Sequence, residues 1–180
     1  GLRGRWSEAL GWNASVYRTD LNDDILFISS GGAVNAGVFQ NSGKTRRQGL
    51  ELGIHGRIGK LDLAANYGYI DATFESALTL NSPSNSSAVA GDIQVSPGNK
   101  VPGIPEHAMK LRMEYEISEA VSVGTNVMVF SSQYARGDEN NQDANGRIPG
   151  YALVNLDARY HFNKQLLFFG RVTNLFDEEY

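Results

Sequence analysis

The chain has 180 residues, with 16 lysine and arginine side chains against 20 aspartate and glutamate side chains, so its formal net charge at pH 7 is −4. A chain of this length is normally one domain, large enough to bury a core. No basic block stands out, which leaves nucleic-acid binding without electrostatic support. The absence of cysteine excludes a disulfide framework and a thiolate metal site. No run approaches the roughly 20 apolar residues of a membrane-spanning helix.

In the first half of the chain, apolar and polar side chains alternate with the period of two that is typical of β-strands. A loop rich in Gly, Ser and Asn is expected over residues 29–36. The turn at Gly59-Lys60 separates the last two strand segments of this half. Strand segments are predicted at Leu2–Trp6, Leu10–Thr19, Ile25–Ile28, Phe39–Ile58 and Leu61–Tyr69.

The second half opens with an irregular stretch from Glu75 to Lys100, rich in Ser, Asn, Pro and Gly. An insertion of this length in a compact domain is usually functional or mobile. A second long polar loop is expected from Gln133 to Ile148. Strand segments are predicted at Ile104–Ile117, Val121–Val129, Ala152–Phe162 and Leu166–Val172.

These segments predict an antiparallel, up-and-down all-β fold of about eight strands. Short turns near Glu8, Gly59, Glu119 and Lys164 fall at one end, and long loops near Gly32, Asn85 and Asn141 fall at the other. Outer-membrane barrels have this asymmetry, with short periplasmic turns and longer extracellular loops. The aromatic residues Trp6, Trp12, Tyr160 and Phe162 lie near the short turns, where an interfacial girdle is expected.

Four stretches carry a resemblance to a known family. They are Gly150-Tyr151-Ala152-Leu153-Val154-Asn155-Leu156, Val172-Thr173-Asn174-Leu175-Phe176-Asp177-Glu178-Glu179-Tyr180, Val101-Pro102-Gly103-Ile104-Pro105-Glu106-His107, and Asn41-Ser42-Gly43-Lys44 leading to Gln48-Gly49-Leu50-Glu51-Leu52. Their order and spacing resemble the C-terminal barrel region of TonB-dependent outer-membrane receptors. The resemblance spans essentially all 180 residues.

The resemblance implies a transmembrane β-barrel in the bacterial outer membrane, in contact with outer-membrane lipid. Residues 1–180 are expected to be a partial barrel domain, without the plug domain and the last strand of the family. The whole protein is expected to import a scarce nutrient, most often a ferric siderophore, with energy from the TonB complex acting through the plug. No chemistry on the cargo, no cofactor and no nucleic-acid partner are implied.

Charged side chains on the polar strand faces are the first set of candidate functional residues. Cross-strand ion pairs on a water-exposed sheet would explain them structurally. In a barrel they line the lumen and contact the plug. The set comprises Arg57, Lys110, Arg112, Glu114, Glu116, Asp157, Arg159 and Arg171.

Tyr134, Arg136 and Arg147, at the mouth of a long loop, are the candidates for contact with an anionic ligand. Arginine can grip carboxylate or phenolate oxygens, and tyrosine offers a flat face. Asn174–Asp177 is predicted to be a strand-end turn held by hydrogen bonds rather than a binding motif.

Metal sites and catalytic sites receive little support. Residues 141–146 match the first half of a calcium loop, but the acid expected at its twelfth position is replaced by Ala152. The three histidines, His55, His107 and His161, do not have ligand spacing, and no Gly-x-Ser-x-Gly elbow is present. We therefore expect no metal site and no enzyme.

Two alternatives remain open from the residues themselves. One is a smaller eight-stranded barrel with a structural or adhesive role, closing on its own segments. The other is a soluble, secreted, carbohydrate-binding β-sandwich, which would bury the Met109–Ile117 face against a second sheet.

Overall fold

The computed structural model describes residues 1–29 and 37–179, and within them the chain forms β-strands and no helix. Nothing in these residues is a helix long and apolar enough to cross a membrane. The strands are β1 (Leu2–Arg5), β2 (Leu10–Leu21), β3 (Ile25–Ser29), β4 (Gly37–Asn41), β5 (Thr45–Ile58), β6 (Leu61–Phe74), β7 (Leu78–Asn81), β8 (Asp92–Val95), β9 (His107–Glu116), β10 (Val121–Phe130), β11 (Tyr151–His161) and β12 (Leu167–Val172).

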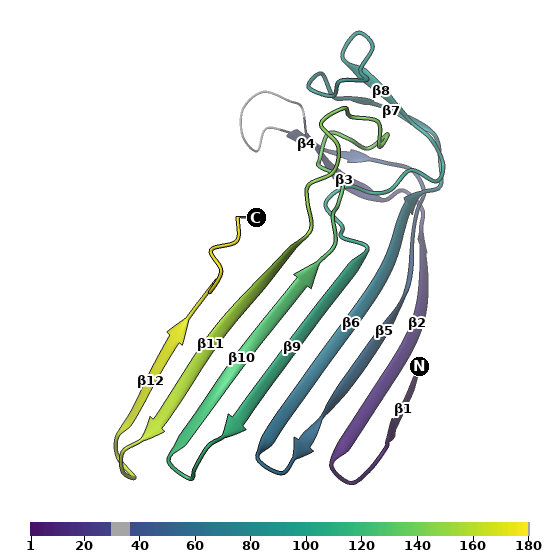
Figure 1. Ribbon diagram of the computed structural model, residues 1–180. Coiled ribbons are helices and arrows are strands. Elements are labelled where there is room, and N and C mark those ends of the chain that lie inside the picture. The colour runs from purple at the N-terminus through teal and green to yellow at the C-terminus, as the bar shows by residue number, and fades with distance from the viewer. Residues whose placement is uncertain (30–36, 180) are drawn as a thin grey trace.

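Eight of these strands form one curved antiparallel sheet in the order β1-β2-β5-β6-β9-β10-β11-β12 (Figure 1). Each long strand is followed in the sheet by the next long strand in the chain, so the up-and-down prediction is confirmed. Within the described residues the sheet is open, with β1 and β12 at opposite edges. An eight-stranded barrel closing on its own segments would require these two strands to pair, so the small-barrel alternative does not fit.

The short turns and the long loops lie at opposite ends of the sheet, as predicted (Figure 1). Gly59, with φ of 59°, forms the tight β5–β6 turn at the short-turn end. Aromatic rings gather near this end: Trp6 stacks on Trp12 with centroids 6.3 Å apart, and Tyr160 stacks on Phe168 at 6.4 Å. The predicted loop over residues 29–36 lies almost wholly outside the described residues.

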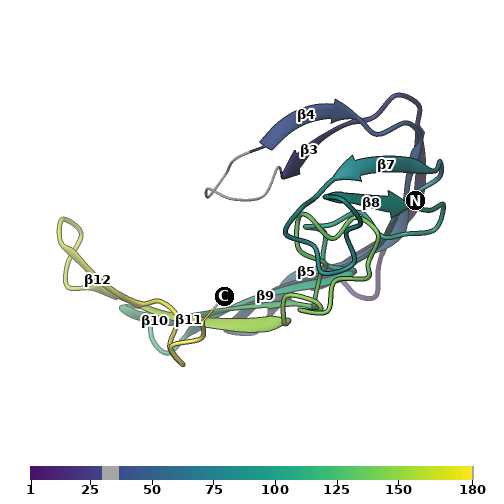
Figure 2. The ribbon, with the colours of Figure 1, turned by 90° about the horizontal axis from the view of Figure 1, so that it is seen from above.

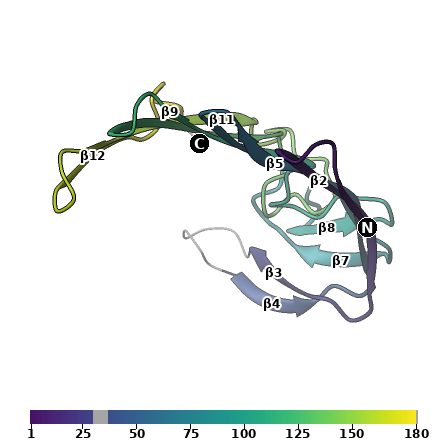
Figure 3. The same cartoon turned by 90° about the horizontal axis from the view of Figure 1, so that it is seen from below.

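The loops beyond β2 and β6 each contain a further hairpin, β3–β4 and β7–β8. Both hairpins lie over the concave side of the sheet (Figures 2 and 3). Under β7–β8, Ala72 and Phe74 from the end of β6 are buried against Leu80, Ile93 and Val95. This small apolar cluster lies at the long-loop end of the sheet. Because β7–β8 is over the concave side, the face of β6 that carries Phe74 is the concave face.

The strand pairings extend this assignment to the whole sheet. Asp62 lies on the same face of β6 as Phe74, because the two are separated by an even number of residues. Asp62 is opposite Arg57 on β5 and Glu114 on β9, so the charged positions of these strands share the concave face. The convex face carries the apolar positions, and many of them are exposed: Val16, Leu52, Ile58, Met109, Tyr115, Val123, Leu156 and Val172. The sandwich alternative would need a second sheet over this face, and the described residues supply none.

Three predicted boundaries are wrong. The strand predicted over Leu61–Tyr69 runs five residues further, to Phe74. The expected strand from Phe39 to Ile58 is broken, because Asp24 exchanges backbone hydrogen bonds with Ser42 and Gly43 and so closes the base of the β3–β4 hairpin. The stretch from Glu75 to Lys100 is not wholly irregular, because it contains β7 and β8.

The predicted strand-end turn at Asn174–Asp177 is confirmed. The Asn174 backbone N–H donates to Asn155 Oδ1 at 2.8 Å, and the Asn174 side chain donates to the Glu178 carbonyl at 3.0 Å. In return, the Glu178 N–H donates to Asn174 Oδ1 at 2.9 Å. The asparagine therefore closes a turn that leaves β12 and ties it to β11.

The buried ring of Phe74 generates a prediction. Its exposed fraction is 0%, so Phe74→Ala should leave a cavity and destabilise the packing of β7–β8 by about 3–5 kcal/mol. Amide hydrogen exchange of the full-length protein should show β7 and β8 losing protection while β9–β11 keep theirs. Val89→Ala is the control, because Val89 is in the same loop and 79% exposed. Equal protection of β7–β8 in both variants would contradict the packing role.

Candidate functional site

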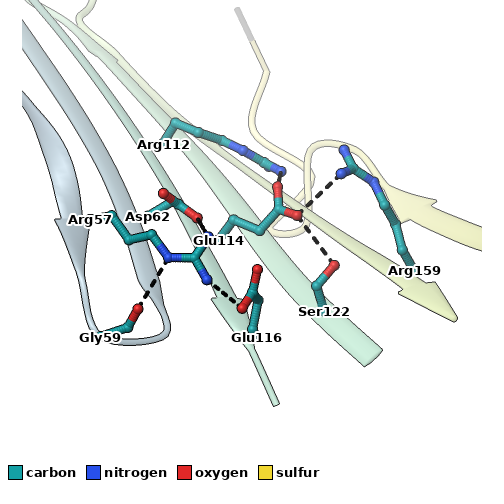
Figure 4. A network of polar contacts seen from close by, with 8 residues as sticks. All are labelled: Arg57, Gly59, Asp62, Arg112, Glu114, Glu116, Ser122 and Arg159. Atoms are coloured by element: carbon teal, nitrogen blue, oxygen red, sulfur yellow. Dashed lines mark hydrogen bonds and ion pairs between the residues drawn. The ribbon is translucent and has the colours of Figure 1, made fainter. Parts of the chain in front are cut away.

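The concave face of the sheet carries a network of ion pairs near the short-turn end. Arg57 on β5 pairs with Asp62 on β6 at 3.3 Å and also with Glu116 on β9 (Figure 4). Its Nε donates to the Gly59 carbonyl at 3.1 Å, which holds the guanidinium over the β5–β6 turn. Three strands are thus linked by one side chain.

A second group of polar contacts links β9 and β11 by ion pairs and β10 by a hydrogen bond. Arg112 pairs with Asp157 on β11 and with Glu114 on its own strand at 2.9 Å. Arg159 of β11 also reaches Glu114, at 3.1 Å, and Ser122 Oγ donates to the same carboxylate at 3.2 Å (Figure 4). Glu114 is therefore the centre of this second group.

Gly124 of β10 makes the Arg112–Asp157 pair possible, because β10 lies between the strands that carry the two residues. A Cβ at Gly124 would lie 2.6 Å from Arg112 Nη2 and 2.8 Å from Asp157 Oδ1. The charged groups of Arg112 and Asp157 thus occupy the space that a side chain at Gly124 would take. The two residues are 45 positions apart in the sequence.

The eight charged residues singled out from the sequence all lie on this concave face, by strand register. Six of them are in ion pairs. Arg171 of β12 is opposite Asp157, and Lys110 of β9 is opposite Asn66 of β6. Among the described residues, neither Arg171 nor Lys110 has an acidic oxygen within ion-pair distance. Charged contact with a plug stays a prediction.

At the long-loop end, the three candidate ligand residues separate into two groups. The Arg147 guanidinium lies over the Tyr134 ring, 4.8 Å from its centroid, donates to the Ser132 carbonyl at 2.8 Å and lies 3.7 Å from Glu106. Arg136 points elsewhere, with its guanidinium 5.6 Å from the centroid of the Phe27 ring.

Around Arg136 the structure assembles an aromatic patch that the sequence analysis missed. Phe27 of β3 and Phe39 of β4 are directly opposite in register, and their rings meet edge to face at 5.5 Å. Phe39 is 76% exposed, and Arg136 has no acidic partner among the described residues. The Arg136 guanidinium, from the loop between β10 and β11, thus meets two aromatic rings of the β3–β4 hairpin, which lies over the concave side. The sequence signal was the apolar Ile25–Ile28 run, but it gave no sign that Arg136 would approach it.

A buried polar junction joins the loop that carries Arg136 to the β7–β8 loop. The Gly137 carbonyl accepts hydrogen bonds from Ser82 Oγ at 2.7 Å and from Asn85 Nδ2 at 2.8 Å. Asp138 and Glu139 follow, each 2% exposed. In each carboxyl group one oxygen accepts backbone N–H donors, while Asp138 Oδ2 and Glu139 Oε2 have no partner in the described structure.

This burial shifts the pKa of the Glu139 carboxyl. Desolvation raises the pKa of the Glu139 carboxyl, hydrogen bonds from Gly137 and from its own backbone N–H oppose the shift, and the neighbouring Asp138 adds to it. The closed junction therefore keeps a proton on this carboxyl to a higher pH than an exposed glutamate would.

The metal candidates do not come together. Asp143 of the loop that resembled a calcium site accepts hydrogen bonds from Ser86 Oγ at 3.0 Å and from the Asn145 N–H at 3.1 Å. His107 contacts Tyr67, with 2.8 Å between Nδ1 and the hydroxyl oxygen. In residues 1–29 and 37–179, no three His, Asp or Glu side chains are grouped as a metal site would require.

The Arg112–Asp157 pair predicts a difference between two glycines. Gly124→Ala should displace the pair and lower the free energy of unfolding by about 1 kcal/mol. Gly68→Ala should be neutral or stabilise by about 0.5 kcal/mol, because a Cβ there would meet nothing within 4 Å. Denaturant unfolding of the full-length protein measures both. Equal effects of the two substitutions would show that the gap at Gly124 does not matter.

The loop junction predicts a dependence on pH. Because the folded pKa of Glu139 is raised above its ordinary value of 4.5, the junction binds a proton that the open loops release as the pH rises above that value. The contribution of Glu139 to the stability of the junction should be fully present below pH 4.5, fall as the pH rises through the raised pKa, and then level off.

Amide exchange of residues 82–87 and 137–143, corrected for the intrinsic rate, measures this stability. Glu139→Gln should remove most of the pH dependence, whereas Glu119→Gln, in an exposed turn, should leave it unchanged. A carboxyl with a raised pKa titrates between about pH 4 and about pH 8. Constant protection of the wild-type junction over this range would contradict the assignment.

Comparison with known proteins places the chain. Residues 1–175 match the family model "TonB dependent receptor-like, beta-barrel". The probable TonB-dependent siderophore receptor PiuA of Acinetobacter baumannii is 28% identical over 172 residues, which cover 95% of this chain and 21% of PiuA. The catecholate siderophore receptor Fiu of Escherichia coli K12 is 26% identical over 168 residues, which cover 93% of this chain and 20% of Fiu.

The crystal structure of the ferric-catecholate import receptor Fiu from E. coli K12, in its closed form, superimposes with a TM-score of 0.67. The two chains are 24% identical, and the match covers 97% of this chain and 22% of Fiu. At this identity the similarity supports the fold alone. The chain thus spans about a fifth of the length of the relatives it matches. It belongs to the TonB-dependent receptor family, and its sheet is part of the wall of a β-barrel in the bacterial outer membrane.

Proposed function

We propose that the protein imports a ferric siderophore through the outer membrane, and that the patch formed by Arg136, Phe27 and Phe39 contacts this cargo. The observation that carries the proposal is the position of an arginine without an acidic partner next to an aromatic pair, the exposed Phe39 and the partly buried Phe27, on a hairpin over the inner side of the barrel wall. The names of two relatives, a probable siderophore receptor and a catecholate siderophore receptor, support the class of cargo.

The chemistry of the patch favours an aromatic, anionic cargo. Catecholate groups are flat rings whose deprotonated oxygens are negative. The Arg136 guanidinium can donate hydrogen bonds to such oxygens while the Phe27 and Phe39 rings pack against the ligand ring. Exposure of Phe39 to water is costly unless a partner covers it, so cargo binding would also bury apolar surface.

Tyr134 and Arg147 have a supporting part in this proposal. Arg147 is already engaged by Tyr134, Glu106 and the Ser132 carbonyl, so it is less available to an anion than Arg136. The Gly103 N–H donates to the Tyr134 carbonyl at 2.9 Å, which ties this loop to the segment before β9. The two residues would hold the loop that carries Arg136.

Transport by the whole protein would need parts beyond these 180 residues. We infer a plug domain inside the barrel, with TonB supplying energy through it, from membership of the family. The ion-paired inner wall supports this inference, because charged side chains on the barrel interior suit a watery lumen or a polar domain rather than lipid. The cargo is carried and not chemically changed.

Arg136 supplies the test. In the full-length receptor, Arg136→Ala should weaken binding of a ferric catecholate siderophore by roughly 30-fold, the effect of losing a charge-assisted hydrogen bond of about 2 kcal/mol. Phe39→Ala should weaken it less, and Arg147→Ala least, because Arg147 is held by other groups. Titration calorimetry or quenching of intrinsic fluorescence measures the dissociation constant.

Arg18→Ala is a control, because Arg18 is paired with Asp20 at 2.8 Å outside the patch. A receptor that binds no ferric siderophore of any class would refute the proposed function. Binding that is unchanged by Arg136→Ala would refute the site.

A further inference from the structure

The backbone next to Arg136 is held by a loop and not by the barrel wall. Gly137 has φ of 98°, a conformation that favours glycine, and its carbonyl accepts hydrogen bonds from Ser82 and Asn85 of the β7–β8 loop. A Cβ at Gly137 would lie 3.3 Å from Ser82 Oγ, so the two loops are in close contact here. One residue earlier, the Arg136 guanidinium extends to the Phe27 ring. The place of this cation therefore depends on how firmly the β7–β8 loop holds Gly137.

Two buried acids follow Gly137 in the chain, and they are supported unequally. Asp138 Oδ1 accepts the N–H groups of Gln142 at 2.8 Å and of Asp143 at 2.9 Å. Glu139 Oε1 accepts the Gly137 N–H at 3.0 Å. Each acid is 2% exposed and has a second oxygen without a hydrogen-bond partner in the described structure. Because burial of an unpaired charged oxygen is costly, the junction is poorly suited to two ionised carboxyl groups.

The elements packed around Glu139 do not supply a compensating cation within the described residues. The β7–β8 loop contributes neutral serine and asparagine side chains. Lys100, from the segment before β9, meets the Glu139 loop through its backbone carbonyl, which accepts a hydrogen bond from an asparagine of that loop at 3.1 Å. The Lys100 ammonium group pairs instead with Asp71 at 2.7 Å and Glu106 at 2.6 Å. Burial, and then the like charge of Asp138, raise the pKa of the Glu139 carboxyl.

We propose that Glu139 is a positioning residue for the Arg136 patch, and that a proton on its carboxyl group keeps Arg136 next to Phe27. When the proton leaves, two adjacent carboxylates share a closed space, and the junction opens so that water can reach them. The Gly137 carbonyl then leaves the β7–β8 loop, and the guanidinium moves with the backbone. Cargo binding should therefore be strongest where Glu139 is protonated, and it should weaken as the pH rises.

This inference rests on the proposed function, because it takes the Arg136 patch as a contact for an anionic cargo. It adds control of that contact by protons. A proton and the cargo both favour the closed junction, so by linkage each strengthens the binding of the other. Glu139 does not touch the cargo and acts only through Arg136.

The cargo affinity of the full-length receptor, measured between about pH 5 and about pH 8, tests this coupling. Glu139→Gln is neutral at this position at every pH and resembles the protonated acid in shape. Wild type and this variant should bind a ferric catecholate siderophore equally well at the acidic limit. At the alkaline limit the wild type should bind roughly fivefold more weakly than the variant, which is the lower end of typical coupling between two sites. Comparison of the two proteins at each pH removes the effect of protonation of the siderophore itself.

A second substitution separates positioning from a general effect on the loops. In the Arg136→Ala background, Glu139→Gln should leave the affinity unchanged at every pH, because the group to be positioned is absent. Glu119→Gln, in an exposed turn at the short-turn end, is the control and should keep the pH dependence of the wild type. The proposal is overturned by an affinity ratio between wild type and Glu139→Gln that is constant with pH, or by an effect of Glu139→Gln that persists without Arg136.

Ser82→Ala tests the same junction from the opposite loop and replaces Glu139→Gln if that variant does not fold. It removes one of the two side-chain hydrogen bonds to the Gly137 carbonyl. Cargo affinity at the acidic limit should fall by up to roughly fivefold, as the loss of one hydrogen bond allows, and its dependence on pH should flatten. Heat-modifiable mobility on a gel checks that each barrel is folded. Wild-type affinity of a folded Ser82→Ala receptor at every pH would also overturn the proposal.

A distance measurement that needs no cargo separates this proposal from the proposed function. The chain contains no cysteine, so within it spin labels on Ala135→Cys and Val38→Cys report only the loop before Arg136 and the β3–β4 hairpin. The distance between the labels should widen with rising pH in the wild-type background and stay constant with Glu139→Gln. A receptor that shows this widening but binds no siderophore supports the positioning role and refutes the cargo. A receptor that binds the siderophore at a label distance independent of pH refutes the positioning role alone.

Discussion

The hydrogen-bond requirement of the backbone governs this structure. A strand in lipid has no water to satisfy its N–H and C=O groups, so each strand must pair on both sides within a closed sheet. The six inner strands of the described sheet meet this requirement through antiparallel neighbours on both sides. Pairing then fixes the side chains, because alternate residues must point to opposite faces. Apolar residues on the convex face and charged residues on the concave face follow from the same ladder.

The concave face shows how a regular ladder can carry different local sites. Where Gly124 lies between Arg112 and Asp157, its lack of a side chain lets an ion pair cross a strand. Where Gly68 lies between Glu51 and Ala108, the same lack leaves a hollow. The backbone is alike in the two places. The difference lies in the neighbours, which are long and oppositely charged in one case and short or already engaged in the other.

The sequence was a good guide to the sheet because the signal for a strand is local. Met109 to Glu116 alternates over the length of β9, and its register with β10 follows from the short turn between Glu116 and Val121. The register with β6 does not follow from a turn, because the long loop that contains β7 and β8 joins the two strands. The Asn174 turn was likewise predictable, because its hydrogen bonds lie within five residues or on the adjacent strand.

The loops could not be predicted in the same way. β7 and β8 have four residues each, too few for alternation to stand out from a stretch rich in Ser, Asn and Gly. Their stability comes from Phe74, which belongs to another element. The approach of Arg136 to Phe27 is also a product of tertiary structure, since the two residues belong to different loops. Of the three candidate ligand residues, the sequence could not show that Arg147 would be occupied by Tyr134 and Glu106.

The loop junction gives the Arg136 patch a structural basis that the sheet does not provide. The Gly137 carbonyl, next to Arg136 in the chain, is held by Ser82 and Asn85 of the β7–β8 loop. That loop is itself anchored on Phe74 at the end of β6, while Phe27 belongs to a hairpin closed at its base by Asp24. The position of the guanidinium therefore depends on three loops at once. A change that opens the junction around Glu139 would move Arg136 away from Phe27 without breaking a hydrogen bond of the barrel wall, so the position of Arg136 and the stability of the wall are separable properties of this chain.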